Sequence, residues 1–313
     1  MNRHQPGLIT LSRATLTLSL LLLVGICACD NSKPETVPTA TTVTPPPPPA
    51  ATTTPPPPKP TFIIETRGKD AREMVKVPAG PFTRGSLAGV GRDEEHPQKT
   101  ITLKTFWIDR QEVTVADYKK CVSKGACKSS TFRKGKKPRP GKKPPSCNYG
   151  TLDRENHPIN CVSWFGAKAY CAWAGKRLPT EAEWEKSARG TDGRTFPWGD
   201  DIADCSRACM IKRSMAGCGK RTTCPVGSYP QGVSPYGAMD MSGNVYEWVA
   251  DSYSRGYYAK APDSDPINKE KTTFRPGRGG AFSSDAEGVR TTQRSGFEAD
   301  ERISYFGFRC AMN

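Results

Sequence analysis

The cysteines constrain this chain more than any other feature. Of its 12 cysteines, ten lie between Cys121 and Cys310, and an even number in an exported protein indicates a disulfide-bonded domain. The alternative is structural zinc. None of these cysteines has Cys-x-x-Cys spacing, and beyond the N-terminal segment the only histidines are His96 and His157, so the sequence favours disulfides over zinc.

The N-terminal segment predicts export. A basic start precedes an apolar run from Leu16 to Ile26, which is too short to span a membrane as a stable helix and is typical of a signal peptide. The run ends at Ala28 and Cys29, which resemble a bacterial lipobox. We therefore expect residues 1–28 to be a lipoprotein signal peptide and Cys29 to carry the lipid. The alternative is an ordinary signal peptide cut near Ala28.

Residues 29–61 form a linker rich in Pro and Thr, with unbroken proline runs at Pro45–Pro49 and Pro55–Pro58. Such a segment buries no core and is expected to be a stiff polyproline II spacer, on the order of 90 Å long when fully extended. A lipid followed by a spacer would hold residues 62–313 away from the bilayer. We expect a protein that is lipid-anchored to the bacterial cell envelope, on its periplasmic or outer surface.

Residues 62–313 predict one α+β domain with little regular secondary structure and several disulfides. Residues 74–82 predict a strand that ends in a turn, and the alternation over residues 100–108 predicts another strand. Three helices are expected from their N-cap residues, namely those that begin at Thr114, Ser163 and Thr180 and run to about Val122, Ala174 and Gly190. Beyond residue 190 the sequence predicts mostly turns and short strands.

The formal net charge is +15, and part of it comes from a basic segment. Residues 128–146 are rich in Lys, Arg, Pro and Gly, with eight basic and no acidic residues between Lys128 and Lys143. This pattern suits an acidic polymer of the envelope, or it is a solvated loop. Nucleic acid is not expected as a partner of an exported protein, and no aromatic residues interleave with the basic ones from Lys134 to Lys143.

Several segments follow the order and spacing of one known family. The most specific are the runs Tyr170–Glu185 and Tyr236–Trp248, followed by Arg278–Gly280 and Gly307–Cys310. Over roughly residues 74–312 the chain resembles the formylglycine-generating enzyme (sulfatase-modifying factor) family. The resemblance implies a single compact α+β domain related to the C-type lectin-like fold. Four tryptophans are expected in the core of such a fold, namely Trp164, Trp173, Trp184 and Trp198.

The resemblance also implies a calcium ion. Its ligands would be the side chains of Asp240 and Glu247 and the backbone carbonyls of Gly243 and Val245. Calcium is a hard cation that takes carboxylates and carbonyls from tight loops that contain glycine. The alternative is a turn without calcium, in which the two carboxylates cap backbone amides. The family's second calcium site is not expected, because its Asn falls on Cys209.

A disulfide between Cys171 and Cys310 is a further implication of the resemblance. The remaining pairings are less determined: Cys121 with Cys127, Cys147 with Cys161, and two pairs among Cys205, Cys209, Cys218 and Cys224.

One departure from the family pattern concerns catalysis. The family's enzymes oxidise a cysteine in a Cys-x-Pro-x-Arg motif of sulfatases to formylglycine, using oxygen and a copper(I) ion held between two cysteine thiolates. Here Ser284 and Val289 occupy those two positions, and Ala281 replaces a motif Ser. Copper(I) prefers soft sulfur ligands, so a hydroxyl and an isopropyl group do not hold it.

Two interpretations follow from this departure. In the first, the chain is a catalytically silent family member that acts as a binding or scaffolding module for a peptide, a glycan or an acidic polymer. In the second, it is an oxygen-dependent oxidoreductase of the family with non-standard ligands. We favour the first and expect calcium but no copper.

Overall fold

The computed structural model describes residues 61–129 and 147–313. The expected signal peptide, Cys29, nearly all of the linker and most of the basic segment lie outside the described residues. Within those two ranges, no helix is both long enough and apolar enough to cross a membrane.

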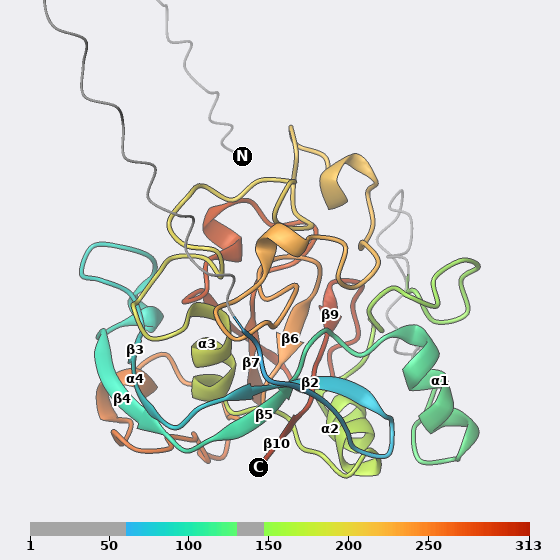
Figure 1. The fold of residues 1–313 in the computed structure, drawn as a ribbon, viewed down its shortest axis with the longest axis horizontal. Helices are drawn as coiled ribbons and strands as arrows, with labels where there is room; N and C mark the ends of the chain where they lie inside the picture. The colour runs from blue at the N-terminus through green and yellow to red at the C-terminus, as the bar shows by residue number, and fades with distance from the viewer. Residues whose placement is uncertain (1–60, 130–146) are drawn as a thin grey trace, which may run out of the picture. The chain divides into compact units, whose positions relative to one another are not determined.

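Short strands and short helices alternate with long irregular segments (Figure 1). The strands are β1 Ile64–Arg67, β2 Arg72–Val77, β3 Gly80–Arg84, β4 Lys99–Leu103, β5 Phe106–Asp109, β6 Tyr246–Trp248, β7 Phe274–Arg278, β8 Arg294–Glu298, β9 Phe306–Gly307 and β10 Ala311–Met312. The α-helices are α1 Val115–Ser123, α2 Trp164–Trp173, α3 Glu181–Arg189 and α4 Tyr257–Lys260. Four 3-10 turns are η1 Asp93–Glu95, η2 Gly217–Gly219, η3 Pro230–Gly232 and η4 Glu287–Val289.

The strands form three sheets. The first has the order β1-β2-β5-β10, and in it Ile108 of β5 is paired with Val75 on one side and Ala311 on the other. This sheet therefore joins the two ends of the described domain. The second sheet is β3-β4, and the third has the order β8-β7-β6-β9, in which β6 and β9 run parallel.

The strand predicted to end in a turn within residues 74–82 is present as β2, but the chain forms a further strand, β3, after the turn. The single strand predicted over residues 100–108 is wrong, because this segment contains the two strands β4 and β5. Residues 74–82 break at Pro78, and residues 100–108 break at Lys104 and Thr105. Proline has no N–H for a sheet and ends a central strand. The breaks let β2 pair with β5 while β3 pairs with β4 in a separate sheet.

The three predicted helices are confirmed. Thr114, Ser163 and Thr180 each accept a hydrogen bond from a backbone N–H of the first turn. In α3, Glu183 also accepts from the Thr180 N–H, which completes the capping box. These ends are recognisable in the sequence because a cap needs only residues that are close along the chain.

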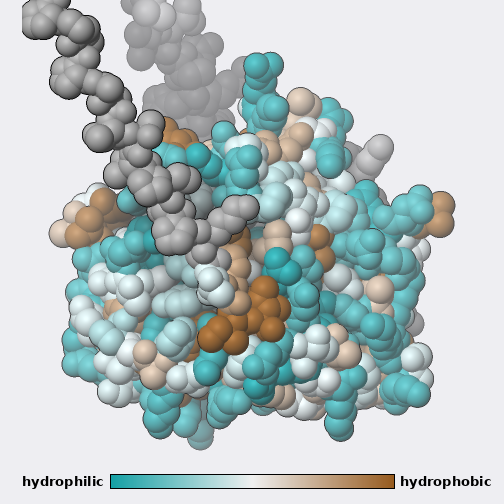
Figure 2. Space-filling model, viewed as in Figure 1, coloured by the Kyte–Doolittle hydropathy of each residue, from teal (hydrophilic) through white to brown (hydrophobic). Residues whose placement is uncertain are grey.

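The core consists of two large clusters. One surrounds α2 and includes Tyr170 and Trp248, and the other lies between α3 and the first two sheets and includes Trp184. The expectation that four tryptophans are core residues is only half right. Trp164 and Trp184 are buried, whereas Trp173 and Trp198 are half-buried. Figure 2 shows that one face is mostly hydrophilic, with a compact hydrophobic area near its centre.

Buried ion pairs fix α3 against the third sheet. The Arg294 guanidinium donates to both oxygens of Glu181, at 2.7 and 2.8 Å, and Arg278 donates to Glu185 at 2.7 Å. All four side chains are buried. Buried pairs contribute less to net stability than their attraction implies, because desolvation opposes it, but removing one partner is strongly destabilising. These pairs therefore specify how α3 packs against the third sheet.

Candidate functional site

Ser284 and Val289, the two positions that the family resemblance predicts for copper ligands, lie in the turn after β7 and in η4. The Ser284 hydroxyl accepts a hydrogen bond from the Ala281 N–H at 3.0 Å, and the Ser284 N–H donates to the Ala281 carbonyl at 2.9 Å. The Ser284 hydroxyl thus accepts a hydrogen bond that closes its own turn. Val289 is fully buried and packs in an apolar cluster with Phe196 and Met210. A hydroxyl and an aliphatic side chain do not fit copper(I), which prefers sulfur ligands.

Polar groups nevertheless remain around Ser284. Burial raises the pKa of Tyr246, and hydrogen bonds with Ser284 and Gln293 offset part of the rise, so these three side chains adjoin. Gln293 is buried and donates to the Ser295 hydroxyl at 3.0 Å. Its carbonyl oxygen has no hydrogen-bond partner among the described residues. A buried acceptor of this kind is costly unless a ligand or water donates to it.

Three of the predicted calcium ligands, Asp240, Gly243 and Val245, lie on a tight turn before β6, and the fourth, Glu247, lies in β6 itself. Asp240, Gly243 and Asn244 all have positive φ, at 58°, 83° and 60°. A Cβ on Gly243 would lie 2.5 Å from the Cys209 carbonyl oxygen, so this position requires glycine. The Asp240 carboxylate accepts from the Gly227 N–H at 2.6 Å.

Glu247, the second predicted carboxylate ligand, already has strong partners. Arg309 donates to both of its oxygens at 2.7 Å, and the Trp184 indole donates to it at 2.9 Å. A calcium ion at this turn would have to share Glu247 with Arg309. Within residues 61–129 and 147–313, no three His, Cys, Asp or Glu side chains converge to hold a metal, so calcium would depend on the carbonyls of Gly243 and Val245 as well.

Sequence reasoning missed Glu112. This side chain is fully buried, and neither carboxylate oxygen has a hydrogen-bond partner among the described residues. Burial raises the pKa of Glu112 well above its ordinary value, and the nearby charge of Asp240 adds to the rise. Burial likewise raises the pKa of Asp240. The signal in the sequence was an acidic residue three positions after the apolar strand that ends at Asp109.

The carboxyl groups of Glu112, Asp240 and Glu247 all interact electrostatically with Arg309, although they do not converge on one point closely enough to hold a metal by themselves. At neutral pH this buried cluster needs bound protons or a further cation to balance its charge. The donor set fits calcium in kind, since carboxylates and carbonyls are what that ion takes. Calcium stays a prediction.

All ten cysteines of the described residues form disulfides. Cys171 and Cys310 are bonded, as the family resemblance implied. Cys121 pairs with Cys127 and Cys147 with Cys161, as expected. The open pairings resolve as Cys205–Cys218 and Cys209–Cys224, so no free thiol is available to a metal in this part of the chain.

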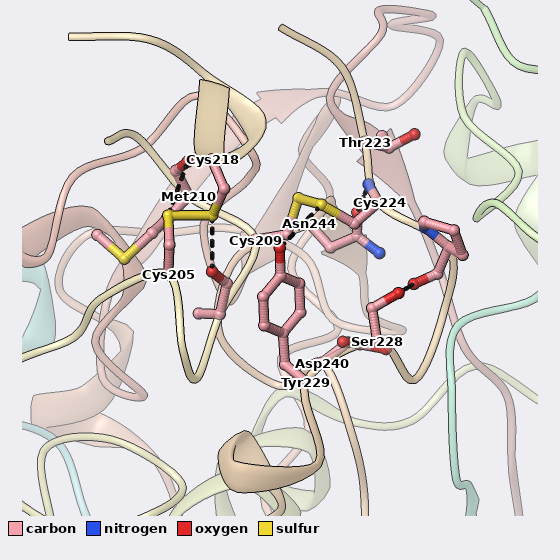
Figure 3. The surroundings of a disulfide bond; sticks show 12 residues. Cys205, Cys209, Met210, Cys218, Thr223, Cys224, Ser228, Tyr229, Asp240 and Asn244 are labelled. Atoms are coloured by element: carbon pink, nitrogen blue, oxygen red, sulfur yellow. Dashed lines mark hydrogen bonds between the residues drawn. A yellow bond between two sulfur atoms is a disulfide. The ribbon is translucent and has the colours of Figure 1, made fainter. Parts of the chain in front are cut away.

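Figure 3 shows how the last two disulfides adjoin the predicted calcium turn. The Asn244 N–H donates to the Cys209 carbonyl at 2.8 Å, and the Asn244 amide oxygen accepts from the Cys224 N–H at 3.0 Å. The Cys224 sulfur lies 3.2 Å from the Tyr229 hydroxyl. Cys209, where the family's second calcium site would need an Asn, is instead a covalent link to Cys224.

These features agree with comparison to known proteins. Residues 61–313 match the family model described as "Sulfatase-modifying factor enzyme 1-like domain". The chain belongs to this family. It is 33% identical over 287 residues to the formylglycine-generating enzyme of Streptomyces coelicolor, an alignment that covers 78% of this chain and 90% of the relative.

The chain is also similar to a member of the sulfatase-modifying factor family that is named as inactive. The chain is 31% identical over 277 residues to the "Inactive C-alpha-formylglycine-generating enzyme 2" of Bos taurus, which covers 76% of this chain and 87% of that protein. Among solved structures, PvdO from Pseudomonas aeruginosa superposes with a TM-score of 0.66 at 29% identity, over 82% of this chain and 99% of that one. These matches confirm the single mixed domain with few helices.

Proposed function

We propose that this chain is a catalytically silent member of the sulfatase-modifying factor family that acts as a binding module at the bacterial cell envelope. One observation carries the proposal. The two positions that hold copper in the family's enzymes are a serine whose hydroxyl closes its own turn and a valine sealed in an apolar cluster. Every described cysteine that could substitute is in a disulfide.

The polar surroundings of Ser284 support a binding role. Tyr246 and Gln293 remain beside it, and the Gln293 carbonyl oxygen lacks a donor among the described residues. A peptide or a glycan offers N–H or O–H groups that would satisfy this acceptor. The basic segment from Lys128 to Lys143 would add affinity for an acidic envelope polymer.

The envelope location rests on the sequence. The lipobox-like end of the signal peptide, the proline-rich spacer and the paired cysteines are together typical of a lipoprotein that holds its domain in an oxidising compartment.

Turnover tests the silent state. The protein is incubated with copper(I), a reductant and a Cys-x-Pro-x-Arg peptide under air, and the peptide mass is measured. We expect no aldehyde product, while an active family enzyme converts the peptide under the same conditions. Conversion by the unmodified protein would overturn the proposal.

A paired variant sharpens this test. Ser284→Cys with Val289→Cys restores two thiols at the family's copper positions, and we expect it to bind copper(I). Ser283→Cys with Val289→Cys is the matched control, because Ser283 is the exposed neighbour of Ser284. Equal copper binding by both pairs would show that these positions are not the metal site we assume.

The second candidate is an oxidoreductase with non-standard ligands. The observation in its favour is that the chain is about as similar to the Streptomyces coelicolor enzyme as to the bovine protein named inactive, at 33% and 31% identity. The same turnover measurement decides between the two functions.

A further inference from the structure

A separate hollow lies between the end of α1 and the start of α2, two helices that pack against each other (Figure 1). Its volume is about 260 Å³, and its lining includes Tyr118, Lys128, Phe165, Gly166 and Arg302. Neither the Ser284 and Val289 positions nor the predicted calcium ligands contribute to it. The hollow therefore needs an explanation of its own.

Two cationic residues line this hollow, and no acidic residue of the described chain lines it. Lys128 and Arg302 are the charged residues of the lining. Elsewhere in the described chain, most arginines donate to a carboxylate, as Arg309 does to Glu247. Arg302 lies close enough to the Tyr118 hydroxyl for its charge to act on it, and Lys128 is an exposed residue of the same lining. Positive charge beside a hollow favours an anion there, and a guanidinium matches a planar carboxylate with two parallel hydrogen bonds.

Apart from Ser129 and Ser163, the rest of the lining consists of apolar and aromatic residues. Tyr118 is buried, and its ring stacks on that of Tyr170 with centroids 5.7 Å apart. Its ring also contacts those of Tyr149 and Phe308, and its hydroxyl donates to the Lys128 carbonyl at 3.1 Å. Phe165, also in the lining, is 58% exposed, although large aromatic side chains are usually covered.

Gly166 keeps the hollow open. A Cβ at this position would lie 3.0 Å from the Val162 Cγ2 atom and 3.3 Å from the Tyr118 hydroxyl. Glycine is unfavourable inside a helix. Gly166 nevertheless lies in the first turn of α2, whose N-terminus is capped by Ser163. Any larger residue here would project toward the side chains that form the floor.

We propose that this hollow binds a small organic carboxylate that has an aromatic body. The carboxylate would pair with Arg302 and Lys128, and the ring would lie against the exposed side chain of Phe165. Burial raises the pKa of Tyr118 to about 12, and the nearby charge of Arg302 offsets part of that rise. The small volume limits the ligand to the size of one substituted ring, since typical ligand pockets start at about 300 Å³.

Equilibrium dialysis of radiolabelled phenylacetate against the full chain in nonionic detergent tests this inference, with detergent alone as the blank. We expect saturable binding of one molecule per chain. Arg302→Gln should weaken it about tenfold or more, and Gly166→Ala should weaken it by filling the hollow. Arg221→Gln is the matched control, because Arg221 is exposed and lies outside the lining.

Competition identifies the chemistry. Neutral phenylacetamide should compete poorly because it lacks the charge, and inorganic phosphate should compete poorly because it lacks the ring. Absence of saturable binding, equal binding by Arg302→Gln, or full competition by either probe would overturn the inference. Thermal melting of each variant identifies any loss of phenylacetate binding that is due to unfolding. Gly166→Ala provides a second test, because it leaves every charge in place. None of these outcomes depends on whether the Ser284 region is catalytically silent.

Discussion

Arg309 forms a two-pronged ion pair with Glu247: its Nε atom donates to one carboxylate oxygen and a terminal nitrogen to the other, both at 2.7 Å. Both residues are buried. The same guanidinium also donates to the carbonyl oxygens of Asp109, Arg110 and Met239. One side chain near the C-terminus thus joins β5, the predicted calcium turn and β6.

Arg309→Met should therefore be strongly destabilising. It leaves the Glu247 carboxylate buried without its counter-ion, which costs about 3–5 kcal/mol of unfolding free energy. Urea denaturation measures this loss. Arg110→Met is the control, since Arg110 pairs with Glu73 at the surface and such pairs contribute less than about 1 kcal/mol. Similar losses in the two variants would contradict the assignment.

The disulfides should differ in their contribution to stability according to their spacing. Cys171 and Cys310 are separated by 139 residues, and Cys121 and Cys127 by 6. In the chain-entropy model the longer loop stabilises by about 5 kcal/mol and the shorter by about 2 kcal/mol. We expect the double alanine variant of the first pair to lose more stability in chemical denaturation than that of the second. The reverse order would show that local packing, not loop closure, dominates.

His157 should make stability depend on pH. Burial and the charge of Arg154 lower the pKa of His157 from 6.5 to about 4. The unfolded chain takes up this proton at a higher pH than the folded chain does. The neutral His157 ring therefore contributes fully to the free energy of unfolding above pH 6.5. This contribution is lost as the pH falls to 4, by up to about 3 kcal/mol. His157→Gln should flatten the stability profile over that window. The ring proton signal of His157 in NMR checks the cause, and a midpoint above pH 6 would refute it.

Calcium should bind at the turn that carries Asp240. We expect one calcium ion per chain in metal analysis. We also expect a higher melting temperature when calcium is added, because a ligand that binds only the folded state stabilises it. The gain is about 2.7 kcal/mol when the ligand concentration is 100 times its dissociation constant. Asp240→Ala should abolish this shift, whereas Asp285→Ala, at an exposed position, should keep it. A wild-type protein that melts at the same temperature with calcium and with a chelator would favour the turn without calcium.

Lipidation should depend on Cys29 and not on Cys27. Cys29→Ser should abolish incorporation of labelled palmitate and release the protein from membranes, because no residue is left to carry the anchor. Cys27→Ser is the matched control, two positions earlier in the same segment, and should remain labelled. Label in neither the wild type nor the control would favour the ordinary signal peptide.

Much of the fold was recognisable from the sequence because its signals are local. Thr114, Ser163 and Thr180 cap helices through contacts within three residues, and the motif that ends at Cys310 indicated its bond to Cys171 through the family pattern. The strand pattern was less informative. It did not reveal that the chain changes sheet after Val77, where β2 ends, and after Leu103, where β4 ends.

The candidate sites divide in the same way. The sequence by itself determined that Ser284 and Val289 stand where copper ligands would be, because that comparison needs only residue identity and spacing. Only the tertiary structure decided that Cys209 bonds Cys224, that Glu112 lies beside Asp240, and that Arg302 faces the same hollow as Lys128. Each of these relationships joins residues that are distant along the chain. Their proximity follows from how the sheets, helices and disulfides pack together, and short-range sequence patterns do not encode it.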